Sequence, residues 1–284
     1  MVTQANAPAY HRSDDADTYK KNASFVYNPE NTRAVLELLD PKPGEKILDV
    51  GCGTGELTRQ LHALVSSSGD GGCVVGTDLS ANMISAARKR GNDEGINPRV
   101  EVVDGHDLES WLEKQGLVGT FDKVFSNAAL HWMKADPAAV VRGMSRALRP
   151  GGILVLEMGG HLNIVGLRSA LHVALAQHGI DAATVDPWYF PTLASYSNLL
   201  LSNGFGSVPE ARLVPRPTPL PRPAGLAGFL ETFAGPFLNA LPDDKARNDV
   251  VQRVIKQLKV DMYDAEEDQW TAMNCRLRVR AIKA

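Results

Sequence analysis

The chain has little of several features by which particular classes of protein are recognised. Its 284 residues include only three cysteines, Cys52, Cys73 and Cys275, whose odd number and wide separation fit neither a disulfide framework nor a zinc-binding cluster. No apolar run approaches the roughly 20 residues of a membrane span, and the polar amino terminus contains no stretch suited to a secretory signal. These absences predict a cytoplasmic protein with no metal and no membrane partner.

The chain also lacks a large excess of charge of either sign. The net charge is −3 and no run of lysine or arginine occurs, which argues against a nucleic-acid partner. The mildly basic exception is the alternation of Arg276, Arg278 and Arg280, which a strand would place on one face. The composition therefore favours a small-molecule substrate, and it leaves open whether the protein is a monomer or a homodimer.

The segment 46–56 joins a short apolar strand to a glycine-rich turn and the start of a helix. Gly51, Gly53 and Gly55 allow positive φ angles and a close approach of backbone to a ligand. A dinucleotide fingerprint has the spacing G-x-G-x-x-G, but here Glu56 occupies the position of its last glycine. An acid at a helix start would repel a pyrophosphate and is harmless or helpful beside a cationic ligand. The turn thus predicts a nucleotide-like cofactor that is not a dinucleotide.

The same segment resembles the first motif of the class I S-adenosylmethionine-dependent methyltransferases. Four further segments follow in the order that this family has them: Val74–Ser80 with Met83, Val100–Asp107, Phe121–Trp132 and Leu148–Leu156. The resemblance spans residues 45–158 and implies S-adenosylmethionine as cofactor, S-adenosylhomocysteine as product, and no metal.

The fold class is α/β. A helix is predicted from Asn28 through Leu39, with Pro29 in its first turn, and strands and helices then alternate to about residue 158. This alternation predicts a doubly wound, Rossmann-like sheet with its ligand at the carboxyl ends of the strands. The resemblance implies seven strands, mostly parallel, with the last one antiparallel.

Beyond residue 160 the pattern becomes more helical. Helices are expected at 162–179, 194–203, 225–233 and 244–258, and strands at 210–214 and 272–283. The proline-rich run 215–223 is predicted to be irregular, because each proline lacks a donor. The resulting expected division is an amino-terminal cap segment and helix at 1–40, a methyltransferase core at 41–216 and 271–284, and a helical substrate lid at 217–270.

Three acids carry most of the predicted cofactor site. Asp78 ends an apolar strand about twenty residues after the turn, where it can accept two ribose hydroxyls, although a helix N-cap is the alternative. The resemblance implies that Asp49 supports the turn and the methionine amino end, and that Asp104 accepts from the adenine amino group unless it only caps its loop. The full predicted cofactor set is Tyr19, Phe25, Asp49, Gly51, Gly53, Thr54, Gly55, Asp78, Leu79, Met83, Asp104, Gly105, His106, Asn127 and Ala128. For Met83, and for Tyr19 and Phe25, ordinary core packing or anchoring is the competing interpretation.

A second, narrower resemblance concerns the methyl acceptor. The segments 19–26, 127–132, 215–221 and 276–283 are similar to trans-aconitate methyltransferase-like proteins, which methylate carboxylates of small di- and tricarboxylic acids. A carboxylate has an ordinary pKa of about 4 and needs no general base, whereas arginine forks would orient it. We therefore expect a small acidic substrate, with His131 and Trp132 as candidate catalytic residues. The predicted substrate-binding residues are His131, Trp188, Tyr189, Arg216, Arg222 and Arg278.

Three alternatives stay open at this point. In the first, the methyl acceptor is a hydroxyl, thiol or amine of another metabolite, and for a hydroxyl His131 would act as base. In the second, the chain is a non-catalytic subunit that binds S-adenosylmethionine. In the third, it is an oxidoreductase of similar topology.

Overall fold

The computed structural model describes residues 21–67, 69 and 71–284, so the predicted cofactor residue Tyr19 lies outside the described residues. The chain divides into two compact units. The core unit contains Val26–His161, Trp188–Pro215 and Cys275–Ala284, and the appended unit contains Leu162–Pro187, Arg216–Asn274 and, of the segment before Val26, the described residues 21–25. The expected division at 216/217 and 270/271 lies close to these boundaries, whereas residues 162–187 group with the segment after residue 215.

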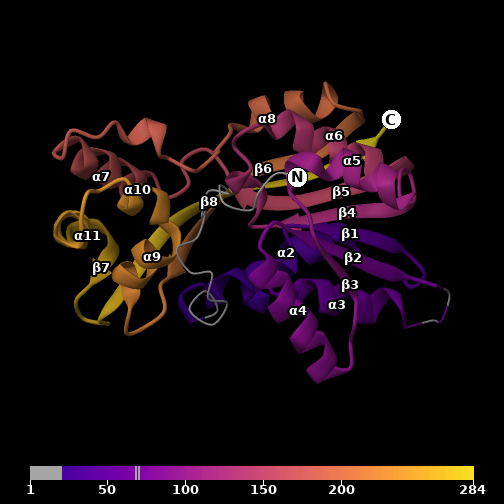
Figure 1. The fold of residues 1–284 in the computed structure, drawn as a ribbon, viewed down its shortest axis with the longest axis horizontal. Helices are drawn as coiled ribbons and strands as arrows, with labels where there is room; N and C mark the ends of the chain where they lie inside the picture. The colour runs from indigo at the N-terminus through magenta and orange to yellow at the C-terminus, as the bar shows by residue number, and fades with distance from the viewer. Residues whose placement is uncertain (1–20, 68, 70) are drawn as a thin grey trace. The chain divides into compact units, whose positions relative to one another are not determined.

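The core unit contains most of the predicted sheet (Figure 1), whereas residues 216–219, 263–264 and 269–274 of its strands belong to the appended unit. The strand order is β3-β2-β1-β4-β5-β8-β6, and the short strand β7 pairs with β8 beside this path. Strands β1 to β5 pair in parallel, and β8 runs antiparallel to β5. The predicted mostly parallel sheet with an antiparallel last strand is therefore confirmed. The strands are β1 Lys46–Val50, β2 Cys73–Asp78, β3 Arg99–Val102, β4 Phe121–Asn127, β5 Leu148–Gly159, β6 Phe205–Pro219, β7 Tyr263–Asp264 and β8 Gln269–Lys283.

Helices cover both faces of this sheet (Figure 1). Strand residues alternate between two apolar clusters: Leu48 and Val50 pack with residues of α5 and α6, whereas Ile47 packs with residues of α2 and α3. Burial on both faces explains why the strands read as nearly continuous apolar runs. The helices of the core unit are α2 Pro29–Leu39, α3 Glu56–Val65, α4 Ala81–Glu94, α5 Leu108–Gln115, α6 Pro137–Ala147 and α8 Leu193–Leu201.

The first helix begins as predicted. The Asn28 side chain caps α2 by accepting a hydrogen bond from Glu30 N at 3.0 Å, and Pro29 occupies the first turn. The helix α4 ends at Glu94, and Gly95 after it adopts a left-handed conformation.

The proline-rich run corrects one prediction. Residues 215–219 were expected to be irregular, but they form the end of β6, which starts at Phe205. The strand order places β6 at the end of the sheet, where a missing backbone donor costs no ladder hydrogen bond if it faces outward. Amides two residues apart point to the same side of a strand, so Pro215, Pro217 and Pro219 can all turn that side away from β8.

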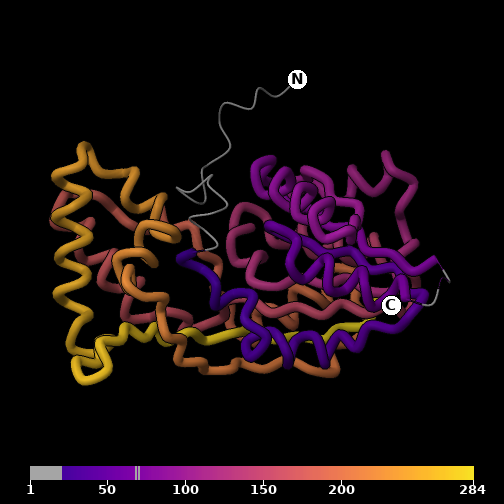
Figure 2. The backbone as a smooth tube through the Cα atoms, turned by 90° about the horizontal axis from the view of Figure 1, so that it is seen from below, coloured from indigo at the N-terminus to yellow at the C-terminus, as the bar shows by residue number. Residues whose placement is uncertain are grey.

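The appended unit is mostly helical. It contains α7 Val165–Ala176, α9 Gly225–Phe233, α10 Gly235–Asn239 and α11 Asp244–Met262, the last of which is drawn as one straight helix in Figure 2. The helix α7 packs along α11, and the rings of Phe25 and Phe229 both pack against Phe233, with centroids 6.2 and 4.7 Å apart. None of the helices in the described part of the chain is long and apolar enough to cross a membrane.

Candidate functional site

The glycine turn between β1 and α3 needs its glycines for two different reasons. Gly51, Gly53 and Gly55 have φ angles of +77°, +55° and +78°, the left-handed region that a Cβ disfavours. At Gly51 a Cβ would also lie 2.1 Å from the Ala129 Cβ, so the close approach there is to the chain itself. Gly55 occupies the N-cap of α3 without a side-chain cap, which leaves backbone amides at the helix start.

Asp78 joins this turn to the end of β2. Its two carboxylate oxygens accept hydrogen bonds from Gly53 N and Ser80 N, each at 2.9 Å. Burial is the largest effect on the carboxyl and raises its pKa, while the two backbone donors oppose that shift. The N-cap of α4 is Ser80, which accepts from Met83 N at 3.3 Å, so Asp78 is not needed as the cap.

Asp49 lies buried inside β1, shortly before Gly51 in the sequence. Its Oδ2 accepts a hydrogen bond from Thr58 Oγ1 at 2.7 Å, on the side of the sheet covered by α3. Burial raises the pKa of Asp49 to about 7, the Thr58 hydroxyl partly opposes this, and the charge of Asp78 adds to it. The carboxyl is thus poised to change protonation near neutral pH.

The loop after β3 is held by Asp104. Its Oδ1 accepts from His106 N at 2.9 Å and lies 2.6 Å from His106 Nδ1, which agrees with the capping interpretation of this acid. His106 Nε2 is buried and has no hydrogen-bond partner among the described residues. A buried polar atom without a partner fits a position where a ligand completes the hydrogen bonding. The sequence placed His106 among the predicted cofactor residues but gave no signal for this ring nitrogen.

The end of β4 presents its backbone in an unusual conformation. Ala128 has a φ of +57°, which costs a non-glycine residue about 1 to 2 kcal/mol. A hydrogen bond from Ala128 N to Glu157 O at 2.7 Å holds this conformation, and Asn127 Nδ2 donates to Val26 O at 3.4 Å. Such strain is typical of functional positions.

Aromatic residues from two segments of the core unit meet at His131. The His131 ring is buried and lies 5.9 Å from the ring of Phe190, and Trp132 lies 6.1 Å from Trp188. Tyr189 N donates to His131 O at 2.8 Å. The structure therefore brings together residues from two distant segments of the sequence. They are the predicted residues His131, Trp132, Trp188 and Tyr189.

The predicted arginines are divided between the two units. Arg278 Nε and Nη2 donate to Glu157 Oε2 at 2.8 and 2.6 Å, and both side chains are largely buried. Arg216 and Arg222 belong to the appended unit, where Arg222 donates to Gln269 Oε1 at 3.1 Å and also to the Glu267 carbonyl. Sequence reasoning missed Glu157; its signal was an acid inside the apolar strand β5.

The remaining predicted cofactor residues differ in exposure. Leu79 is 38% exposed at the end of β2, whereas Met83 is buried on α4. Phe25 is buried in the appended unit, and a Cβ on Gly105 would lie 2.6 Å from Met133 Sδ. Thr54 is buried within the turn. No group of three or more His, Cys, Asp or Glu side chains suited to a metal ion occurs in the described ranges.

Comparison with known proteins finds relatives of the segment that carries the candidate cofactor site, and relatives of nearly the whole chain. A family profile described as a methyltransferase domain matches residues 47–152. An uncharacterized methyltransferase of Schizosaccharomyces pombe is 31% identical over 274 residues, which covers 94% of this chain and 97% of the relative. A demethylmenaquinone methyltransferase of Bacillus cereus is 31% identical over 156 residues, or 55% of this chain and 62% of that protein.

Solved structures share the fold. The YcgJ protein from Bacillus subtilis superposes with a TM-score of 0.57 at 12% identity, covering 88% of this chain and 98% of that one. The Haemonchus contortus phosphoethanolamine N-methyltransferase 2, in complex with phosphomonomethylethanolamine and S-adenosylhomocysteine, gives a TM-score of 0.54 at 20% identity over 95% of this chain and 58% of that one. Because the match to the fission-yeast relative extends over nearly the whole of both chains, this chain belongs to the class I S-adenosylmethionine-dependent methyltransferases.

Proposed function

We propose that the chain transfers the methyl group of S-adenosylmethionine to a carboxylate of a small di- or tricarboxylic acid, held beside His131 and Trp132. The bound cofactor supplies an electrophilic methyl carbon on a sulfonium, so the chain has to align the acceptor and exclude water. The observation that carries the choice of a carboxylate is the hydrogen bond from Gly159 N to His131 Nδ1, at 3.4 Å.

That hydrogen bond assigns the tautomer of His131. An imidazole nitrogen that accepts from a backbone N–H carries no proton, so in the neutral ring the proton is on Nε2. Protonation of Nδ1 would set two N–H groups against each other. His131 is therefore suited to donate a hydrogen bond from Nε2 and poorly suited to take a proton from a hydroxyl. A carboxylate, already ionised at neutral pH, needs only such a donor.

Arg278 is the anion-binding residue that this proposal favours. Glu157 accepts from Nε and Nη2, and no described residue accepts from the Nη1 donors of the same guanidinium. A second carboxylate of the substrate is a suitable acceptor for them. The insertion 217–270 keeps its proposed role as a substrate lid, with Arg216 and Arg222 as further candidate contacts.

The described residues also fit the cofactor. We propose that Asp78 accepts the ribose hydroxyls, that the loop of Asp104 and His106 binds adenine, and that Asp49 attracts the methionine ammonium. The buried Nε2 of His106, without a partner among the described residues, supports the adenine assignment. The carbonyls of Asn127 and Ala128 would line the methionine part.

The acceptor class is tested by S-adenosylhomocysteine release against small acids, phenols, thiols and amines, with mass detection of the product. We expect turnover with a di- or tricarboxylic acid and a kcat that is flat between about pH 6.5 and about 9, because no base is titrated. Replacement of His131 by Gln, whose amide retains a donor, should lower kcat less than about tenfold. A kcat that rises with pH and falls about 100-fold or more in His131→Gln would show a general base and overturn the carboxylate assignment.

The role of Arg278 is tested separately by Arg278→Lys, which keeps a charge beside Glu157 but loses the planar fork. The KM for the acid should rise about tenfold with little change in the KM for S-adenosylmethionine. Arg280→Ala, on the same face of β8, is the matched control and should change neither value. An unchanged acid KM in Arg278→Lys would remove this residue from the substrate site.

Asp49 makes cofactor binding depend on pH. Since its pKa is about 7 and only the ionised carboxylate attracts an ammonium, the affinity for S-adenosylmethionine should rise about tenfold between about pH 6 and about pH 8, with release of a proton. The same raised pKa makes the ligand-free protein less stable as pH rises from about 4 to about 7, because the unfolded chain loses this proton first. Calorimetry in buffers of different ionisation enthalpy measures the proton. Asp49→Asn should abolish both the proton release and the rise; their persistence would exclude Asp49.

A further inference from the structure

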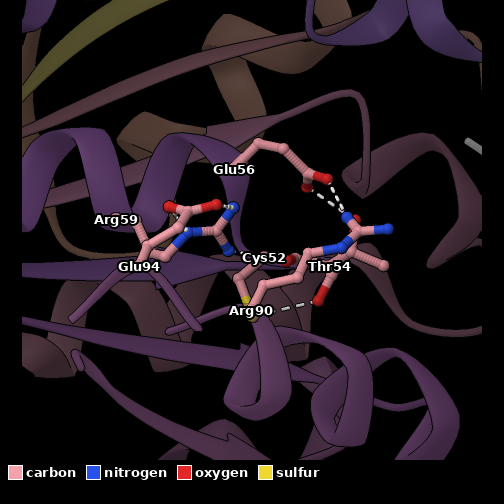
Figure 3. A network of polar contacts seen from close by, with 7 residues as sticks. Cys52, Thr54, Glu56, Arg59, Arg90 and Glu94 are labelled. Carbon is pink, nitrogen blue, oxygen red and sulfur yellow. Dashed lines mark hydrogen bonds and ion pairs between the residues drawn. The ribbon is translucent and has the colours of Figure 1, made fainter. Parts of the chain in front are cut away.

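One face of α4 lies against the glycine turn and the start of α3. Ala87, Arg90 and Glu94 are spaced three and four residues apart, so they share a face of the helix. A Cβ on Gly55 would lie 3.1 Å from the Ala87 Cβ, which shows how closely the helix approaches the turn. Figure 3 shows Arg90 and Glu94 reaching Glu56 and Arg59 of α3.

The first pair connects α4 to Thr54 through Glu56. Arg90 Nη1 donates to Glu56 Oε1, and the Thr54 hydroxyl donates to Glu56 Oε2 at 2.5 Å. The Arg90 and Glu56 side chains are 18% and 24% exposed, so water screens this pair less than an ordinary surface pair. The acid at the helix start, which the sequence analysis considered only for its effect on an anionic or cationic ligand, is paired with Arg90.

The second pair connects α4 to Thr54 through Arg59. Arg59 Nε and Nη2 donate to the two carboxylate oxygens of Glu94 at 2.8 and 3.3 Å, and Nη1 donates to Thr54 O at 3.0 Å. The Arg59 side chain is 8% exposed and that of Glu94 is 51% exposed, so the guanidinium is buried while its carboxylate partner reaches water. One residue of the turn is consequently held at its hydroxyl by one ion pair and at its carbonyl by the other.

We infer that Glu56 and Arg59 are positioning residues that set the affinity of the glycine turn for its cofactor. Thr54 lies between Gly53, whose amide donates to Asp78, and Gly55, the N-cap of α3. With the Thr54 hydroxyl and carbonyl both fixed, the turn is held in the conformation that presents its amides, and the cofactor does not have to order it on binding. This inference rests on the proposed binding of S-adenosylmethionine at that turn.

The test separates holding of Thr54 from general stability. Arg59→Ala should weaken binding of S-adenosylmethionine and raise its KM about tenfold, equal to about 1.4 kcal/mol, with a much smaller change in kcat. The exchanged variant Arg59→Glu with Glu94→Arg restores an ion pair of the same two charges but leaves no donor for Thr54 O. It should recover most of the lost Tm while the KM stays raised. Arg146→Ala, which removes a pair of interhelical contacts between α6 and α5, is the control and should leave the KM unchanged.

Each outcome has one meaning. If calorimetry shows no binding of S-adenosylmethionine by the unaltered protein, the proposed function fails. If that protein binds and the exchanged variant recovers KM together with Tm, or if Arg59→Ala leaves the KM unchanged, the positioning role is overturned and the network only stabilises the fold. Should Arg59→Ala fail to fold, Glu56→Ala with Arg90→Ala removes the acceptor of the Thr54 hydroxyl together with its ion-pair partner, and the same raised KM is expected.

Discussion

Replacement of Gly51 by alanine is expected to destabilise the protein by about 2 to 5 kcal/mol and to abolish cofactor binding. A left-handed φ costs a residue with a Cβ about 1 to 2 kcal/mol, and forcing a methyl group into a filled space costs about 1 to 3 kcal/mol. Both terms apply at Gly51, whose φ is +77° and whose added Cβ would lie 2.1 Å from the Ala129 Cβ. Urea unfolding and calorimetry of S-adenosylmethionine binding measure the two effects.

Two further variants separate these terms. Gly116→Ala has a similar φ of +66° and no atom within 4 Å of the added Cβ, so it should cost only about 1 kcal/mol. Adding Ala129→Gly to Gly51→Ala removes the nearest atom and leaves ordinary contacts at 3.6 Å or more, so the double variant should recover the packing part of the loss. A single Gly51→Ala variant that is no less stable than Gly116→Ala would show that the turn can move away from Ala129.

Replacement of Asp78 by alanine is expected to weaken cofactor binding at least about 100-fold while the sheet stays folded. The loss of two hydrogen bonds from ribose hydroxyls to a carboxylate, each contributing about 1.5 to 3 kcal/mol, gives a penalty of this size or larger. The variant also leaves Gly53 N and Ser80 N without the acceptor they have now. Circular dichroism and Tm monitor the fold, and calorimetry measures binding.

A cofactor analogue distinguishes direct contact from support of the loop. The unaltered protein should bind S-adenosylhomocysteine more tightly than its 2′-deoxy form, and Asp78→Ala should bind the two equally. Asp78→Asn retains one acceptor oxygen, so its preference for S-adenosylhomocysteine over the 2′-deoxy form should lie between those of the unaltered protein and Asp78→Ala. Asp93 is an exposed acid of α4, and Asp93→Ala should leave this preference unchanged. A deoxy penalty that persists in Asp78→Ala would mean that the ribose is held elsewhere.

Local chemistry made part of this site predictable from sequence. The glycines at 51, 53 and 55 follow from backbone geometry, and Asp78 follows from an acid at the end of a buried strand. The capping of α2 by Asn28 is likewise a matter of adjacent residues. Each of these features depends on a few neighbouring positions, which is why pattern and spacing were sufficient.

Other features depend on positions far apart in the sequence. The pairing of Glu157 with Arg278 requires the antiparallel register of β5 and β8, and the fork of Arg59 on Glu94 requires the packing of α3 on α4. The strand conformation of 215–219 requires an edge position that no property of the prolines reveals. The grouping of α7 with α11 had no local signal either, since its apolar residues suit any helix-covered core.

The alternate prolines of β6 also bear on self-association. An edge strand offers a row of unpaired donors and acceptors to which a strand of a second molecule can add. Along Pro215, Pro217 and Pro219 the outward side of β6 has lost those donors. A homodimer formed by continuing the sheet across this stretch would lack the hydrogen bonds that such an assembly needs. Any dimer of this protein is therefore expected to form through side-chain contacts and not by continuing the sheet along Pro215–Pro219.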